Sequence, residues 1–371
     1  NCVCRVRLWQ VRHGELHISA ILMEKIPETI TDAPIRKRAA FLRLVRKSLW
    51  FALPFWALMA LYVYDDPFMV LRKYDLYDSD VMLNEQHVGW QIYRNHKDSV
   101  HFNSFILGNS CTMAFRCAEW EKYLSPGDHA IRLFGNGESL KAISLKLHAL
   151  DKEGAEIKNV LMILDRTSLS RLSPLSGYGN VLPAAVSGDS PFIVQMEFIQ
   201  AFAMPDFLFP YLKYRITGRV EPGMKRMNPY GRIRDSKNND AFNPREKMIE
   251  QEGEAYWRNR KQEFPERDGI AVVEEPVLFQ RQRVLLEEIR KVLRRHDTSV
   301  RVLISPDYSQ KELHPDDRKI LQGIFGKENV YDFSGINEFT EDYHNYYESG
   351  HYRPLLDNQL LERVYNTHHS G

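Results

Sequence analysis

Residues 105–110 read Phe-Ile-Leu-Gly-Asn-Ser, an apolar run that ends in a glycine-containing turn and a serine. The pattern predicts a buried strand over residues 101–107 and a tight turn that carries Ser110 at its carboxyl end. Strand and helix patterns alternate from there onward. Further strands are predicted at 129–134, 160–164, 300–304 and 330–333, and helices at 112–123, 140–150, 275–295, 316–325 and 354–361.

This alternation predicts an α/β fold with a mostly parallel, doubly wound sheet of five strands. Ligands of such sheets bind beyond the carboxyl ends of the strands. Ser110, Gly135 and Asp165 each follow a predicted strand, so we expect a site at that edge. Residues 170–274 interrupt the alternation and are rich in Pro, Gly, Arg and aromatic side chains. We interpret them as an insertion that packs over the sheet and shapes a cleft or touches a membrane; a helical elaboration with partly disordered loops is the alternative.

The composition and motifs of the chain limit the ligands, cofactors and reactions that we expect. The chain has 371 residues and a net charge of +1, which gives no argument for nucleic-acid binding. No zinc spacing, phosphate-binding glycine loop or dinucleotide fingerprint is found, so no cofactor is expected. Four cysteines do not form a disulfide framework. Cys111 lies next to Ser110 and is a rival nucleophile that no motif supports.

Residues 49–64, LWFALPFWALMALYVY, carry no charge. At about 1.5 Å per residue they reach roughly 25 Å, the short end of a transmembrane helix. Asp65 and Asp66 follow, whereas six basic residues precede the run: Arg36, Lys37, Arg38, Arg43, Arg46 and Lys47. This asymmetry predicts a cytoplasmic N-terminus. A buried core helix and a cleaved signal peptide are the alternatives.

The predicted organisation is therefore a basic cytoplasmic tail (1–47), a membrane anchor (48–65), a polar lead-in (66–100) and an α/β domain (101–371). Residues 1–30 are not obviously globular.

A second motif, Glu348-Ser349-Gly350-His351, lies near the C-terminus ahead of a helical pattern. A serine hydroxyl becomes a useful nucleophile when a base removes its proton, and histidine does this near neutral pH. A carboxylate on the other ring nitrogen fixes the tautomer and stabilises the imidazolium. Ser110, His351 and Glu348 are thus a candidate catalytic triad. Asp342 is an alternative acid and His344 a rival base.

Gly108-Asn109-Ser110 after a strand resembles the first block of the SGNH (GDSL-like) hydrolase superfamily, and Glu348-x-x-His351 resembles its last block, usually Asp-x-x-His. The resemblance covers roughly residues 100–370. It implies a three-layer, flavodoxin-like α/β sandwich and serine esterase chemistry. With the anchor, the chain is similar to a membrane-bound subset that works beside membrane-bound O-acyltransferases in alginate O-acetylation and teichoic acid D-alanylation. That likeness implies an inner-membrane protein with a periplasmic domain.

The resemblance also implies an oxyanion hole made by the Ser110 N–H, a glycine after the second strand (Gly135, or Gly137) and an asparagine after the third. The third strand is followed by Asp165-Arg166-Thr167 and no such asparagine. Losing one donor costs about 2.7–4 kcal/mol of barrier. We therefore expect that Asn136 or Arg166 substitutes, that the enzyme is slow, or that a partner completes the site.

The sequence therefore predicts an anchored esterase or O-acyltransferase that acts on an acyl ester of a cell-surface or exported glycan. A non-catalytic scaffold that binds a glycan or a membrane-bound O-acyltransferase is the second hypothesis, and a hydrolase without an anchor is the third.

Overall fold

The computed structural model describes residues 29–221, 223–228 and 234–366. The chain divides into two compact units, Asn1–Ala57 and Leu58–Gly371. Its first helix, α1 (Thr29–Asp65), contributes to both.

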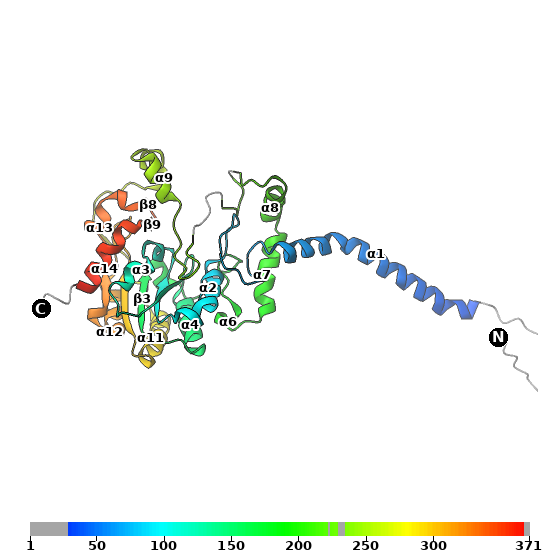
Figure 1. The fold of residues 1–371 in the computed structure, drawn as a ribbon, viewed down its shortest axis with the longest axis horizontal. Coiled ribbons are helices and arrows are strands. Elements are labelled where there is room, and N and C mark those ends of the chain that lie inside the picture. Colours follow the sequence, from blue (N-terminus) through cyan, green and yellow to red (C-terminus); the bar gives the residue numbers. More distant parts are fainter. Residues whose placement is uncertain (1–28, 222, 229–233, 367–371) are drawn as a thin grey trace, which may run out of the picture. The chain divides into compact units, whose positions relative to one another are not determined.

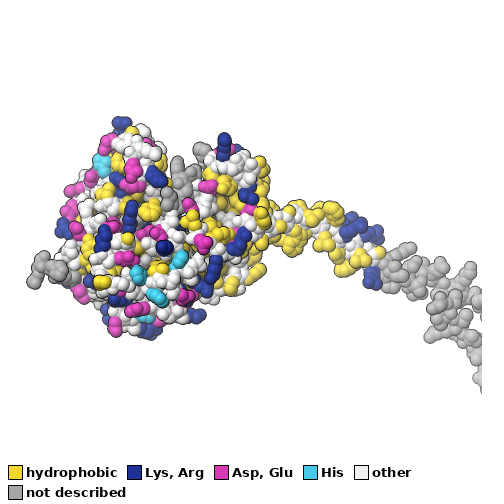
Figure 2. All heavy atoms as spheres, viewed as in Figure 1, with side chains coloured by type: hydrophobic (Ala, Val, Ile, Leu, Met, Phe, Trp, Pro, Cys, Tyr) yellow, Lys and Arg dark blue, Asp and Glu magenta, His cyan; other side chains and the backbone are white. Residues whose placement is uncertain are grey.

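Within α1, the segment Arg38–Asp65 is, among the described residues, the one single helix long and apolar enough to cross a membrane. Its apolar side chains are mostly exposed, for example Trp50 at 68% and Phe51 at 86%. Figure 2 shows them along the helix, with basic side chains nearer its start. An isolated helix with apolar exposed side chains has the composition of a membrane anchor.

The larger unit is built on a five-stranded sheet in the order β2-β1-β3-β5-β7, with every pairing parallel. The strands are β1 (Ser104–Gly108), β2 (Ala130–Phe134), β3 (Asn159–Leu164), β5 (Ser299–Ile304) and β7 (Val330–Asp332). The predicted α/β class and the five parallel strands are confirmed (Figure 1). Two small pairs stand apart: parallel β4 (Val272–Val273) with β6 (Lys311–Glu312), and antiparallel β8 (Tyr346–Glu348) with β9 (His351–Tyr352).

The larger unit also contains helices α2 to α14, and some of their bounds differ from the sequence prediction. They are α2 (Glu85–Val100), α3 (Cys117–Glu121), α4 (Leu140–Lys152), α5 (Arg166–Ser170), α6 (Ala184–Ser187), α7 (Pro191–Ala203), α8 (Pro205–Thr217), α9 (Arg245–Glu252), α10 (Ala255–Asn259), α11 (Gln280–Arg295), α12 (Pro315–Phe325), α13 (Glu338–Glu341) and α14 (Asp357–Asn366). Short 3₁₀ turns are η1 (Ser110–Ala114), η2 (Lys261–Glu263), η3 (Lys327–Asn329), η4 (Tyr343–Asn345) and η5 (Pro354–Leu356).

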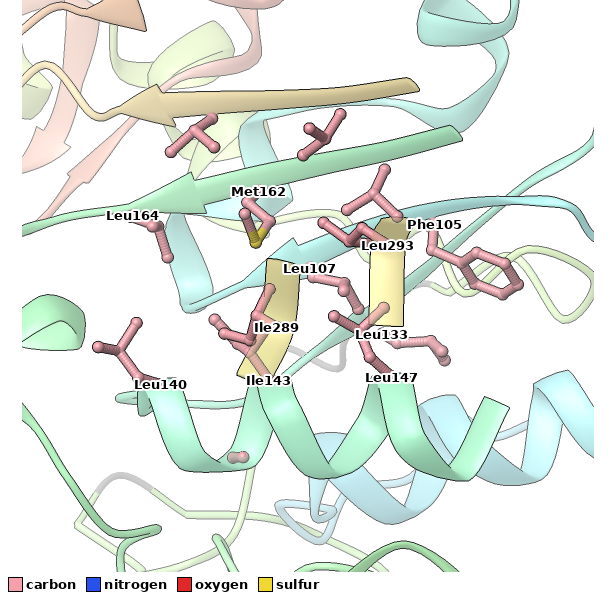
Figure 3. Packing of buried hydrophobic residues seen from close by; sticks show 14 of the residues in the cluster. Phe105, Leu107, Leu133, Leu140, Ile143, Leu147, Met162, Leu164, Ile289 and Leu293 are labelled. Carbon is pink, nitrogen blue, oxygen red and sulfur yellow. The ribbon is translucent and has the colours of Figure 1, made fainter. Parts of the chain in front are cut away.

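Side chains alternate between the two faces of the sheet, and both faces are buried. Phe105 and Leu107 of β1 enter one core cluster with residues of α2, α4, α11 and α12, whereas Ile106 enters a second with residues of α3 and α14. Figure 3 shows the first cluster, where Ile143 and Leu147 of α4 pack against the sheet. Burial on both faces explains why the strands read as continuous apolar runs.

Three predicted segments are corrected. The single helix predicted at 112–123 is split into η1 and α3, because Phe115 and Arg116 adopt extended backbone. The lead-in 66–100 contains α2, whose Val88, Trp90 and Tyr93 belong to the main core. The helix predicted to begin at residue 275 begins at Gln280.

The insertion at 170–274 contains helices α6 to α10, and part of it packs away from the sheet. Residues of α7 and α8 form a third cluster with the end of α1 and with Phe68. Tyr256 and Trp257 of α10 form a fourth cluster with Tyr347 of the β8–β9 hairpin. The insertion thus has one half at the end of α1 and another at the C-terminal hairpin.

Candidate active site

Ser110 lies directly beyond the carboxyl end of the central strand β1. Gly108 pairs with Phe134 of β2 on one side and with Ile163 of β3 on the other. Its φ is +143°, and a Cβ there would lie 2.1 Å from the Ile163 carbonyl oxygen, so only glycine fits. Asn109 then caps η1 by accepting a hydrogen bond from the Cys111 N–H at 2.9 Å. This turn leaves Ser110 half-buried at the first position of η1.

The structure brings Ser110 and His351 together from opposite ends of the domain. Ser110 Oγ lies 2.7 Å from His351 Nε2, within hydrogen-bond distance. The two residues are 241 positions apart. This is the contact that a serine nucleophile and its general base require.

Glu348 completes the arrangement on the other side of the imidazole. Its Oε1 is hydrogen-bonded to His351 Nδ1. Glu348 and His351 are antiparallel partners across the β8–β9 hairpin, whose turn is formed by Ser349 and Gly350. Partners across a two-residue turn face each other, and the hairpin has a register shift between Tyr346 and Glu348, so the glutamate side chain lies against the ring.

Aromatic side chains fix the hairpin on the domain. Tyr346 and Tyr352 are paired in the hairpin and are 1% and 3% exposed, both in the second core cluster. The Trp257 indole N–H donates to the Tyr346 carbonyl at 3.0 Å, and the Tyr256 hydroxyl donates to the Tyr347 carbonyl at 2.8 Å. The base therefore stands on a packed support rather than on a free loop.

Arg245, at the start of α9, contacts the other carboxylate oxygen of Glu348, the candidate acid. Its Nη1 lies 3.3 Å from Glu348 Oε2, 2.6 Å from Glu263 Oε2 and 3.3 Å from the Tyr347 carbonyl. The guanidinium thus holds the Glu348 carboxylate with Oε1 toward the imidazole. Sequence reasoning missed this residue, because it lies in the insertion without a motif and 103 positions before Glu348.

A second ion pair supports the same hairpin from α9. The guanidinium of Arg353 is paired with the Glu246 carboxylate, which also accepts a hydrogen bond from the Tyr347 hydroxyl at 2.6 Å. Burial favours the neutral acid, but the bonds from Arg353 and Tyr347 outweigh it and lower the pKa of Glu246. Glu246 is thus held as an anion next to the triad support.

The predicted oxyanion donors are only partly available. The Ser110 N–H has no acceptor among the described residues, and at the start of η1 it is free to meet a developing negative charge. The Gly135 N–H instead donates to the Gly108 carbonyl at 3.2 Å. Asn136 is half-buried in the turn that follows.

The residues after β3 are engaged in structural contacts. The Asp165 carboxylate accepts a hydrogen bond from Asn109 Nδ2 at 2.7 Å and caps α5 through the Ser168 N–H. Arg166, considered as a substitute donor, has its Nε 3.2 Å from Glu274 Oε2. Asp165 therefore ties the Ser110 turn to β3.

The alternative acid, base and nucleophile are Asp342, His344 and Cys111, and their surroundings do not favour these roles. Asp342 Oδ1 is 2.6 Å from His344 Nδ1, and Glu254 Oε1 is 3.0 Å from His344 Nε2, so the alternative acid and base are bonded to each other. The Cys111 thiol is buried, and burial raises its pKa well above the ordinary value, which disfavours a thiolate. Within the described ranges, no group of three or more His, Cys, Asp or Glu could hold a metal ion.

Comparison with known proteins adds no further information: no family model, no curated protein and no solved structure matches this chain.

Proposed function

We propose that this chain is a membrane-anchored acyl esterase or O-acyltransferase that uses Ser110, His351 and Glu348. The observation that carries the proposal is the contact of Ser110 Oγ with His351 Nε2 at 2.7 Å, with Glu348 on the other ring nitrogen. Supporting it are the parallel sheet with helices on both faces, consistent with a three-layer SGNH-like sandwich, and the position of Ser110 at a strand end.

In the proposed reaction, Ser110 Oγ attacks the acyl carbonyl carbon while His351 Nε2 takes the hydroxyl proton. The negative charge that develops on the carbonyl oxygen is met by the Ser110 N–H. The ester bond then breaks, and His351 returns the proton to the leaving alcohol. Water, or a hydroxyl of a glycan, attacks the acyl-enzyme with His351 again as base, which releases an acid or a new ester. No cofactor enters these steps.

The substrate class and the location rest on the SGNH resemblance and on α1. We infer that α1 crosses the inner membrane, with basic residues on the cytoplasmic side and the catalytic domain in the periplasm. The substrate we infer is an acyl ester, such as O-acetyl, of an exported or cell-surface glycan, and the partner is a membrane-bound O-acyltransferase.

A serine-directed fluorophosphonate tests the nucleophile directly. The detergent-solubilised full chain should be labelled, and Ser110→Ala and His351→Ala should each abolish the labelling. Unlabelled wild-type protein that is folded by circular dichroism would remove the support for an enzyme.

A scaffold that binds a glycan or an acyltransferase is the second candidate. It is favoured by the Gly135 N–H, which is bonded to Gly108, and by Asp165 at the position where an asparagine is expected. In that case Ser110→Ala would leave function in cells intact.

A further inference from the structure

Helices α7 and α8 of the insertion carry apolar side chains on two sides. Their inner sides belong to the third core cluster through Val194, Phe198 and Phe202 of α7 and through Phe207 and Tyr211 of α8. A helix that buries one side in a domain normally presents polar residues on the other. The outer sides of these two helices instead carry large exposed apolar side chains beside polar ones such as Gln200 and Lys213.

The outer side of α7 carries Phe192 at 72% exposure and Ile193 at 60%, and the outer side of α8 carries Phe209 at 66% and Ile216 at 85%. Met204, between the helices, is 50% exposed. Figure 2 shows apolar side chains gathered over these two helices. Contiguous exposed apolar side chains of this size mark a surface that something apolar covers.

The same two helices hold the end of α1. The Tyr211 hydroxyl donates to Asp65 Oδ2 at 2.7 Å, and Arg215 Nε lies 3.0 Å from the same oxygen. Tyr62 lies in the third cluster and accepts a hydrogen bond from Gln195 of α7. Asp65 is the first charged residue after the apolar run of α1, so α7 and α8 lie where that run ends.

We infer that α7 and α8 form a platform that lies in the interface of the membrane anchored by α1, with the outer apolar side chains among the lipids. The inference rests on the proposed membrane span of α1. The apolar run of a spanning helix ends at the boundary between hydrocarbon and headgroups, and α7 and α8 are fixed to that boundary by Asp65 and Tyr62.

The platform lies in the interface and does not form a second span. Each helix has 13 residues and reaches about 20 Å, less than the hydrocarbon core of about 30 Å, and the two axes differ by 70°. Their inner sides are committed to the protein core, which a spanning pair would have to leave. Exposed basic residues follow α8, Arg219 and Lys225, and suit anionic headgroups.

The depth of single labelled positions in vesicles tests the platform in the full chain. In a Cys2→Ser/Cys4→Ser background, Phe209→Cys and Phe192→Cys are labelled with an environment-sensitive fluorophore, and the chain is reconstituted in phosphatidylcholine–phosphatidylglycerol vesicles. Cys111 and Cys117 are buried, so the background itself should take up no label. Trp56→Cys in the apolar run is the positive control. Lys319→Cys on α12, a side chain 76% exposed, is the negative control.

We expect spin-labelled lipids to quench the fluorophore at 209 and 192 by a fraction comparable to that at 56, and to leave that at 319 unquenched. Quenching at 209 and 192 no greater than at 319 would overturn the inference. An apolar emission spectrum at 209 without lipid quenching would also overturn it, because a second copy or a protein partner would then cover the platform. Carbonate extraction separates the two proposals: a chain that leaves the membrane pellet refutes the anchor as well, whereas a retained chain with an unquenched 209 refutes the platform alone.

Discussion

Replacing Glu348 with glutamine tests whether its carboxylate makes His351 an effective base. The amide keeps the size of the side chain but removes the charge that faces His351 Nδ1. In a fully buried triad the equivalent change lowers kcat by about 10⁴-fold. Here the two side chains are 21% and 33% exposed, so water replaces part of the lost interaction. The loss is then close to one charge-assisted hydrogen bond, about 1.5–3 kcal/mol, which slows the reaction about 10- to 150-fold.

The readout for Glu348→Gln is the rate constant for fluorophosphonate labelling of the detergent-solubilised full chain. Asp342→Asn is the matched control, because the exposed Asp342 is bonded to His344, and it should label at the wild-type rate. Thermal unfolding of both variants checks that they remain folded. If Asp342→Asn is the slow variant and Glu348→Gln labels at the wild-type rate, Asp342 is the acid and the assignment to Glu348 is refuted.

Three further predictions concern Arg245, Gly108 and His87. Arg245→Gln should slow labelling about fivefold, because a partly exposed ion pair contributes up to about 1 kcal/mol. Arg245→Lys should restore part of the rate. Equal labelling rates in wild type and both variants would exclude a positioning role for Arg245. Gly108→Ala should lower the free energy of unfolding in urea by more than about 2 kcal/mol, because its Cβ meets the Ile163 carbonyl; an unchanged midpoint would contradict the close approach. Burial lowers the pKa of His87 to about 4. As the pH falls from about 6.5 to 4, the imidazole is therefore protonated in the unfolded chain before it is protonated in the folded one. The free energy of unfolding should fall by about 3 kcal/mol across that window. The stability difference between wild type and His87→Phe should therefore change with pH below 6.5 and be constant above it, a comparison in which the opposite titration of buried Asp357 cancels.

The sheet was predictable because each strand is an apolar run buried on both faces. The predicted strand at 160–164 matches β3 (Asn159–Leu164), and the one at 300–304 matches β5 (Ser299–Ile304). A continuous run of apolar residues is enough to indicate a strand that is buried on both faces.

The break between η1 and α3 was not predictable, because distant residues cause it. The Arg116 N–H donates to Asp357 Oδ2 at 3.0 Å, 241 positions away, and the Arg116 guanidinium lies over the Phe242 ring. These contacts hold Arg116 in extended backbone although the local pattern favours a helix. Tertiary contacts of this kind leave no trace in a local window of sequence.

The candidate site divides in the same way. Two short motifs suggested Ser110, Glu348 and His351 as a candidate triad, and in the structure Ser110 Oγ lies 2.7 Å from His351 Nε2. Arg245 has no motif, and only the packing of α9 against the hairpin reveals it. Arg245 contacts Glu348 through the packing of α9 against the hairpin, and no local sequence pattern records such packing.

The two halves of the insertion are separated by a segment that is fixed to the sheet domain. Arg234 is paired with Glu85 at 2.7 Å, with both side chains 1% exposed, and Asp240 is paired with Arg132 of β2. Removing one partner of such a buried pair costs about 3–5 kcal/mol, so the two pairs attach this segment to the sheet domain. The platform on one side and Arg245 on the other are therefore each attached to a fixed point. The Glu348 carboxylate is positioned by Arg245 and by the β8–β9 hairpin, and in the proposed arrangement the anchor and platform would set only the place of the larger unit at the lipid surface.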